Sequence, residues 1–337
     1  MNKSCRFLSL LLLAAVLCLS GCSKSNEPST DLVVYSPHPI DFITGLVNNF
    51  ENDTGMHVTI VQMGTGEILN SLALDTDEPK CDVLWGGSLS SVASAANLFE
   101  DYTTPNEEHF ADSYRNHEGM FTRFSDIPSV IMVNRNLLGD ISVEGYADLL
   151  NPELKGKIAF ADPRLSSSSF EHIINMLYAM GNGIPENGWD YVRAFLANLD
   201  GKLVSSSKQV YQGVSDGTFA AGLTFEEGGA NYAETDDNIS LIYMKEGVIF
   251  TADGLYIRKG TEHQEQARFF VDYMTGNAVQ TYISQVLNRR TVRNDVEIKA
   301  SLAAKETINE IVIDYRTAGA TKEAWLERFA TIWNEVQ

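Results

Sequence analysis

Cysteine is scarce in this chain of 337 residues. It occurs four times, at Cys5, Cys18, Cys22 and Cys81, so that a single cysteine lies beyond the N-terminal segment. With that segment set aside, Cys81 has no cysteine partner within the chain, and an internal disulfide framework is excluded. We expect Cys81 to be a small buried residue rather than a reactive thiol, because apolar burial raises the pKa of a thiol.

Positive charge is also in short supply. The chain has 25 lysines and arginines against 45 aspartates and glutamates, which gives a formal net charge of −20. Because nucleic-acid binding is carried by lysine and arginine contacts to phosphates, this balance argues against a nucleic-acid partner. A small anion is not excluded, since a buried site can bind it with backbone N–H groups and helix N-termini.

Motifs of catalysis are missing. The chain has no HExxH, no paired CxxC, no nucleophile elbow and no Gly-Lys-Ser/Thr after a glycine-rich loop. Its six histidines are scattered without the spacing of metal ligands. We therefore expect neither an enzyme nor a bound metal or cofactor.

The apolar run at the N-terminus, residues 7–19, is shorter than the roughly 20 residues that span a bilayer. It follows two basic residues and ends in LSGC at Cys22, which resembles the lipobox of bacterial lipoproteins. We therefore predict a signal peptide at residues 1–21, lipidation of Cys22 and a polar tether at residues 22–30. A simple membrane helix and an ordinary cleaved signal are the alternatives.

The rest of the chain alternates β-branched segments with longer amphipathic ones, which is typical of an α/β fold. Short loops between strands and helices predict parallel strands, with a ligand crevice beyond their C-terminal ends. A first series has predicted strands at residues 32–35, 57–62 and 82–85, with helices at residues 40–54 and from 68 to 74. A second series has predicted strands at residues 158–161, 202–204 and 220–225, with helices at residues 168–179 and from 208 onward.

The two series predict two lobes. We interpret the extended segments within residues 128–133 and 241–257 as crossovers between them. The lobe boundaries that follow are residues 31–125 and 240–290 for the first lobe, and residues 126–239 and 291–337 for the second.

Small polar residues and glycine recur where predicted strands give way to helices. Helix N-termini expose unpaired N–H groups and a partial positive charge, and serine and threonine hydroxyls add donors. For any single loop a helix cap is the alternative, but two facing lobes would bring all these donors to one cleft. The junctions are SPHP at residues 36–39, GTGE at 64–67, GGSLS at 86–90, LSSSS at 165–169 and SSS at 205–207.

Two carboxylates, Glu226 and Glu227, follow the last predicted strand of the second series. Carboxylates accept hydrogen bonds from sugar hydroxyls but repel phosphate, so they suit the other end of a ligand that has both groups. A solvated acidic loop is the alternative. His38 could donate to a ligand oxygen, and a purely structural histidine is its alternative.

Several stretches in combination resemble one family. They are LVVYSPHPIDFITGLVNNFENDTGMHVTIVQMGTGEIL, DVLWGGSLSS, FTRFSDIPSVIMVNRNL, ELKGKIAFADPRLSSSSFEH, GLTFEEGGANY and LNRRTVR. Together they resemble the periplasmic sugar-phosphate-binding proteins of ABC importers, in the superfamily of ferric-ion-binding-like solute-binding proteins. The resemblance covers nearly all of residues 31–295 and implies a type II periplasmic binding fold, in which two α/β lobes close over a ligand.

The resemblance also implies a function. A monomeric lipoprotein on the outer face of a bacterial membrane would pass a phosphorylated sugar to an ABC permease and its ATPase subunit. Hexose 6-phosphate, a longer ketose phosphate, a phosphonate and inorganic phosphate stay open as ligands. The ligand contacts that the resemblance implies are Ser36, His38, Thr65, Gly66, Ser88, Ser90, Ser167, Ser168, Ser169, Ser206, Ser207 and Glu226.

One difference from the ferric-ion-binding members of this superfamily bears on the identity of the ligand. Ferric-ion-binding members of the superfamily commonly use two adjacent tyrosines in the region that here reads GGANY, and only Tyr232 is present. Ferric iron prefers anionic oxygen donors, whereas serine-rich loops are suited to donating hydrogen bonds. A ferric-ion-binding protein of an iron importer is the main alternative, and a sensor partner or an esterase is a further one.

Overall fold

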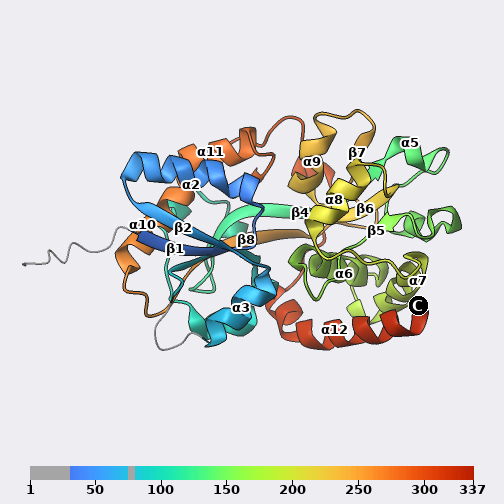
Figure 1. Ribbon diagram of the computed structural model, residues 1–337, viewed down its shortest axis with the longest axis horizontal. Coiled ribbons are helices and arrows are strands. Elements are labelled where there is room, and N and C mark those ends of the chain that lie inside the picture. Colours follow the sequence, from blue (N-terminus) through green and yellow to red (C-terminus); the bar gives the residue numbers. More distant parts are fainter. Residues whose placement is uncertain (1–30, 75–79) are drawn as a thin grey trace, which may run out of the picture. The chain divides into compact units, whose positions relative to one another are not determined.

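The structure is a computed structural model that describes residues 31–74 and 80–337. The predicted signal peptide, the tether and Cys22 lie outside the described residues. Within the two described ranges, no helix is both long enough and apolar enough to cross a membrane. The body that begins at Asp31 is a mixed α/β structure with two lobes (Figure 1), as the sequence pattern predicts.

The first lobe is built on three parallel strands. β1 (Asp31–Ser36) pairs with β2 (His57–Gln62) on one side and with β3 (Val83–Ser88) on the other. Helix α2 (Ile40–Thr54) connects β1 to β2 and buries its apolar face. It ends at Gly55, whose φ of 72° is a left-handed conformation that glycine adopts without strain.

Two long antiparallel strands run from the first lobe into the second (Figure 1). β4 (Thr122–Asn134) pairs with β8 (Phe250–Ile257) along its first half and with β6 (Ala221–Phe225) along its second half. Phe124 on β4 packs in the core of the first lobe, and Ile131 on the same strand packs in the core of the second. These two strands therefore connect the lobes.

The second lobe repeats the plan of the first. β5 (Ile158–Ala159) runs parallel to β6, and β7 (Ile239–Ile242) runs antiparallel to β4. The C-terminal helix α12 (Tyr315–Val336) adds apolar residues to this core. Val248 also packs in this core, although the lobe boundaries predicted from the sequence assign residues 240–290 to the first lobe. The difference arises because the chain returns to the first lobe only along β8.

The other elements complete the two lobes (Figure 1). The helices and the last strand are α3 (Thr65–Leu74), α4 (Leu89–Val92), α5 (Arg135–Leu138), α6 (Ser167–Met180), α7 (Trp189–Asn198), α8 (Ser207–Ser215), α9 (Glu226–Ala233), α10 (Gln264–Met274), α11 (Asn277–Gln285) and β9 (Arg290–Thr291). The 3₁₀ helices are η1 (Ala93–Leu98), η2 (Pro105–His109), η3 (Asp112–Tyr114), η4 (Ala147–Leu150), η5 (Pro152–Leu154), η6 (Pro185–Gly188) and η7 (Lys305–Thr307).

One predicted strand does not form. Residues 202–204 make only a single bridge, between Val204 and Ala161, because the neighbouring strand β5 is two residues long and offers no longer edge to pair with. In contrast, the predicted helix at residues 40–54 and the predicted strand at residues 57–62 begin and end as predicted.

Candidate ligand-binding cleft

A cavity of about 690 Å³ opens between the two lobes. Its walls come from both lobes, and its floor includes residues of the crossing strands β4 and β8. A cavity of this size, lined by a mixture of apolar surface and a few polar groups, is typical of a small-molecule site.

The N-termini of several helices lie at this cavity. α2 starts beside Pro39, α3 starts at Thr65, α6 starts at Ser167 and α8 starts at Ser207, and all four residues line the cavity. The first N–H groups of a helix have no partner within the helix and carry a partial positive charge. The cavity wall therefore offers N–H donors to an anion in spite of the net negative charge of the chain.

Thr65 has a hydroxyl without a partner. Its side chain is buried and lines the cavity, and its Oγ1 has no hydrogen-bond partner among the described residues. Buried hydroxyl groups in folded proteins are almost always hydrogen-bonded. A polar molecule in the cavity would supply the missing partner.

Among the residues that the structure describes, one lysine and two arginines line the cavity. Arg164 is paired with Asp162, and Arg289 is buried between carboxylates. Lys208, in the first turn of α8, is exposed and forms no ion pair with any residue that the structure describes. Its charge is therefore available to a bound anion.

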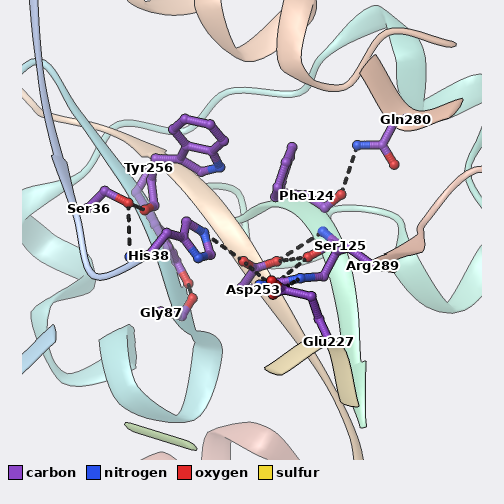
Figure 2. Close-up of polar contacts among 11 residues, drawn as sticks. Ser36, His38, Gly87, Phe124, Ser125, Glu227, Asp253, Tyr256, Gln280 and Arg289 are labelled. Atoms are coloured by element: carbon purple, nitrogen blue, oxygen red, sulfur yellow. Dashed lines mark hydrogen bonds and ion pairs between the residues drawn. The ribbon is translucent and has the colours of Figure 1, made fainter. Parts of the chain in front are cut away.

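The floor of the cavity is a network of charged and hydrogen-bonding groups (Figure 2). Asp253 on β8 accepts hydrogen bonds from the backbone N–H of Ser125 at 3.0 Å and from its hydroxyl at 2.5 Å. Nε2 of His38 lies 3.0 Å from Oδ2 of Asp253. The guanidinium of Arg289 donates to Asp253 at 3.4 Å and, through Nε, to Glu227 at 3.1 Å.

This network sets the charge of Asp253. Burial by itself would raise the pKa of the carboxyl group, but the contacts with His38, Arg289 and Ser125 outweigh burial and hold the pKa below its ordinary value. Asp253 is therefore an ionised hydrogen-bond acceptor at the bottom of the cavity.

A second buried carboxylate belongs to Glu171 on α6. It accepts hydrogen bonds from the hydroxyl of Ser88 at 2.6 Å, from the hydroxyl of Ser90, and from the hydroxyl of Thr251 at 3.1 Å. Burial raises the pKa of Glu171, and these hydroxyls lower it only in part, so the pKa lies above its ordinary value. Glu171, Ser88 and Thr251 line the cavity, whereas Ser90 lies behind them.

Eight of the twelve predicted ligand contacts line the cavity. They are His38, Thr65, Gly66, Ser88, Ser167, Ser168, Ser206 and Ser207. They come from both lobes, so the structure brings together the junctions that the sequence analysis singled out.

The other four predicted contacts do not line the cavity. They are Ser36, Ser90, Ser169 and Glu226. The hydroxyl of Ser36 donates to the carbonyl of Trp85 at 2.7 Å, and the buried carboxylate of Glu226 accepts two hydrogen bonds of 2.7 Å from Arg290. Ser36, Ser90 and Glu226 pair with partners that lie far away in the sequence, so the direction of their polar groups could not be predicted from the junction alone. The hydroxyl of Ser169 is buried beneath the start of α6 and has no hydrogen-bond partner among the described residues.

Glu171, Asp253 and Arg289 line the cavity but are not among the contacts predicted from the sequence. For Arg289 a signal exists, because two adjacent arginines in a chain poor in basic residues complement the adjacent pair Glu226 and Glu227. Nothing local marks Glu171 or Asp253, since their partners come from distant segments.

Solved structures share this fold. The periplasmic binding protein AfuA from Actinobacillus pleuropneumoniae, with exogenous fructose 6-phosphate bound, superimposes with a TM-score of 0.83 at 18% identity, covering 90% of this chain and 98% of AfuA. The apo ferric ion-binding protein A of Pasteurella haemolytica superimposes with a TM-score of 0.77 at 18% identity, covering 90% of this chain and 98% of that protein. These likenesses confirm the predicted two-lobed periplasmic binding fold.

The sequence matches a family as well. The Fe(3+)-binding periplasmic protein of Serratia marcescens is 24% identical over 279 residues, which make up 80% of each chain. The family described as bacterial extracellular solute-binding protein matches residues 79–315, a range that includes most of both lobes and much of the cavity. With its two lobes, its intervening cavity and this match, the chain belongs to the bacterial extracellular solute-binding proteins.

Proposed function

We propose that this chain captures a phosphorylated sugar outside the cytoplasm and delivers it to the permease of an ABC importer, which its ATPase subunit drives. One observation carries the proposal: the N-termini of α3, α6 and α8 converge on a single cavity that also contains the unpartnered hydroxyl of Thr65. Hexose 6-phosphates and ketose phosphates fit this combination of donors.

The anionic end of such a ligand needs many donors. Phosphate oxygens accept hydrogen bonds from helix N–H groups, from hydroxyls and from a lysine. Ser167 and Ser168 begin α6, Ser207 begins α8, and Lys208 follows with its charge unpaired by any described residue. The chemistry of this set suits a phosphate group.

The sugar end needs acceptors. Sugar hydroxyls donate to carboxylates and amide oxygens. Asp253 is ionised at the floor of the cavity, and Glu67, Asn70 and Gln62 add polar atoms to the wall of the first lobe. These residues are the proposed acceptors for the sugar hydroxyls. They replace Glu226, which was predicted for this role but pairs with Arg290.

A ferric ion is the second candidate, and the name of the Serratia marcescens relative favours it. Ferric sites need several anionic oxygen donors in one place. Among the described residues no group of three or more histidines, cysteines, aspartates and glutamates is placed to hold a metal ion. Tyr211 is the one tyrosine among the described residues that line the cavity, and Tyr232 is not one of them.

The proposal is tested by the double variant Ser167→Ala with Ser168→Ala. We expect its dissociation constant for fructose 6-phosphate to rise at least tenfold, because a hydrogen bond to a charged group contributes roughly 1.5–3 kcal/mol. Calorimetric titration measures the change. Asn151→Ala is the matched control: Asn151 caps η5 by accepting from the N–H of Glu153 at 2.9 Å and does not line the cavity, so its loss should lower stability by about 1 kcal/mol and leave affinity unchanged. A double variant with lowered thermal stability and unchanged affinity would assign both serines to capping.

We also propose that Cys22 carries a lipid anchor that holds the chain on the outer face of the membrane. Cys22→Ala should abolish the incorporation of radiolabelled palmitate and release the chain from membranes, while its affinity for ligand stays the same. Label that still enters the Cys22→Ala chain would contradict the anchor.

A further inference from the structure

Glu171 joins the two lobes. It lies on α6, whose neighbouring residues Phe170 and Ile173 pack in the core of the second lobe. Two of its three hydrogen-bond donors, Ser88 and Ser90, come from the end of β3 and the start of α4 in the first lobe. The contact therefore exists only when the lobes stand as they do in this structure.

Ser90 differs from its neighbours in the contact. Ser88 and Glu171 line the cavity, so a bound molecule can touch them. Ser90 is 1% exposed and does not line the cavity. Its hydroxyl donates to the carboxylate of Glu171, and its oxygen lies 2.8 Å from the hydroxyl oxygen of Ser88. A role for Ser90 in binding must therefore act through these two partners.

Helix α12 covers the same contact from outside. Its Gly319 packs so closely on α4 that an added Cβ would lie 3.0 Å from the carbonyl oxygen of Ser90. Lys322 on α12 donates to the carbonyl of Ser91 at 3.4 Å, and its Nζ lies 5.5 Å from the ring centroid of Phe170 beside Glu171. The later part of α12 packs in the core of the second lobe, so this helix spans both sides of the contact.

We propose that the hydrogen bond between Ser90 and Glu171 is an interlobe lock, and that Ser90 is a positioning residue for ligand capture rather than a ligand contact. This inference rests on the proposed function. When the lobes separate, water can hydrate both groups, whereas in the arrangement seen here the buried carboxylate depends on protein hydroxyls. Removal of the Ser90 hydroxyl thus weakens only the arrangement in which the lobes meet.

The lock can be tested by a substitution at Ser90, which does not line the cavity. Spin labels on Asn49→Cys in the first lobe and Asp190→Cys in the second, both exposed, report the distance between the lobes by pulsed electron resonance. We expect Ser90→Ala to lower the ratio of short to long distances about tenfold in the ligand-free chain, and to raise the dissociation constant for fructose 6-phosphate by a similar factor. In a Glu171→Ala background, Ser90→Ala should have no further effect on either quantity.

Ser284→Ala is the matched control. Ser284 is also fully buried and donates a hydrogen bond of 2.6 Å, to the carbonyl of Glu297, away from the cavity lining and from Glu171. It should leave the distance ratio unchanged. If the ratio of short to long interlobe distances is the same in the wild type and in Ser90→Ala, the proposed lock is wrong. If fructose 6-phosphate fails to bind the wild type, the proposed ligand is wrong, and the distance ratio of the ligand-free chain still decides the lock.

Discussion

Replacing Arg289 by methionine is expected to lower the free energy of unfolding by about 3–5 kcal/mol. The Arg289 side chain is 2% exposed and lies between Glu227 and Asp253, whose side chains are 7% and 3% exposed. Its guanidinium also stacks over the ring of Phe42, 4.5 Å from the centroid. Without the guanidinium, two buried carboxylates lose a shared cation, and a buried unpaired charge is among the costliest changes in a folded protein. Urea unfolding at pH 7 measures the change.

Arg328→Met is the matched control for this prediction. Arg328 pairs with Glu186 at the surface, where the two side chains are 43% and 69% exposed, and loss of such a pair should cost less than about 1 kcal/mol. A similarly small loss for Arg289→Met would show that the floor of the cavity is not held by its central cation.

The same variant should show a distinct pH dependence. In the wild type the pKa of Asp253 lies below its ordinary value, so its ionised form stabilises the fold above about pH 4, and this contribution is lost as the pH falls through the folded pKa. In Arg289→Met the carboxyl group of Asp253 lacks the guanidinium that helps to lower its pKa. Protonation of this carboxyl group then removes part of the cost of burying an unpaired charge. The difference in unfolding free energy between the two chains should therefore narrow as the pH falls from 7 toward 4.

The fold was predictable where signals are local. Residues 40–54 form a helix because their apolar positions repeat with helical spacing and Gly55 provides the left-handed end. The lobe boundary near residue 250 was not predictable to the same degree. Val248 and Phe250 pack in the second core while Leu255 packs in the first, and only the pairing of β8 with β4 decides where the chain crosses.

The candidate site was predictable as a set of junctions and less so as individual side chains. Parallel strands end on one side of a sheet, so loops such as those at Thr65 and Ser206 meet in one cavity. Glu226 sits at an equivalent junction, but Arg290, 64 residues further along the chain, engages it. Pairing of this kind depends on tertiary contacts, and one sequence does not reveal which of two adjacent carboxylates meets which of two adjacent arginines.

Discrimination among ligands is the second large effect that we expect. A free sugar leaves the donors at the starts of α6 and α8 without an anionic partner, and inorganic phosphate offers no hydroxyls to acceptors of the cavity wall such as Glu67 and Asn70. Each buried polar group left without a partner costs roughly 1–3 kcal/mol, so a few such groups separate the ligand classes by at least two orders of magnitude in the dissociation constant. Fructose 6-phosphate or glucose 6-phosphate should bind far more tightly than fructose, glucose or inorganic phosphate.

A calorimetric titration of the purified wild-type chain with this panel, and with ferric citrate, tests the central claim most directly. We expect tight binding of at least one sugar phosphate, binding of the free sugars and of inorganic phosphate that is weaker by at least two orders of magnitude, and no competition from ferric citrate. Tight binding of ferric citrate, together with no detectable binding of any sugar phosphate in the panel, would contradict the proposal of a sugar-phosphate ligand.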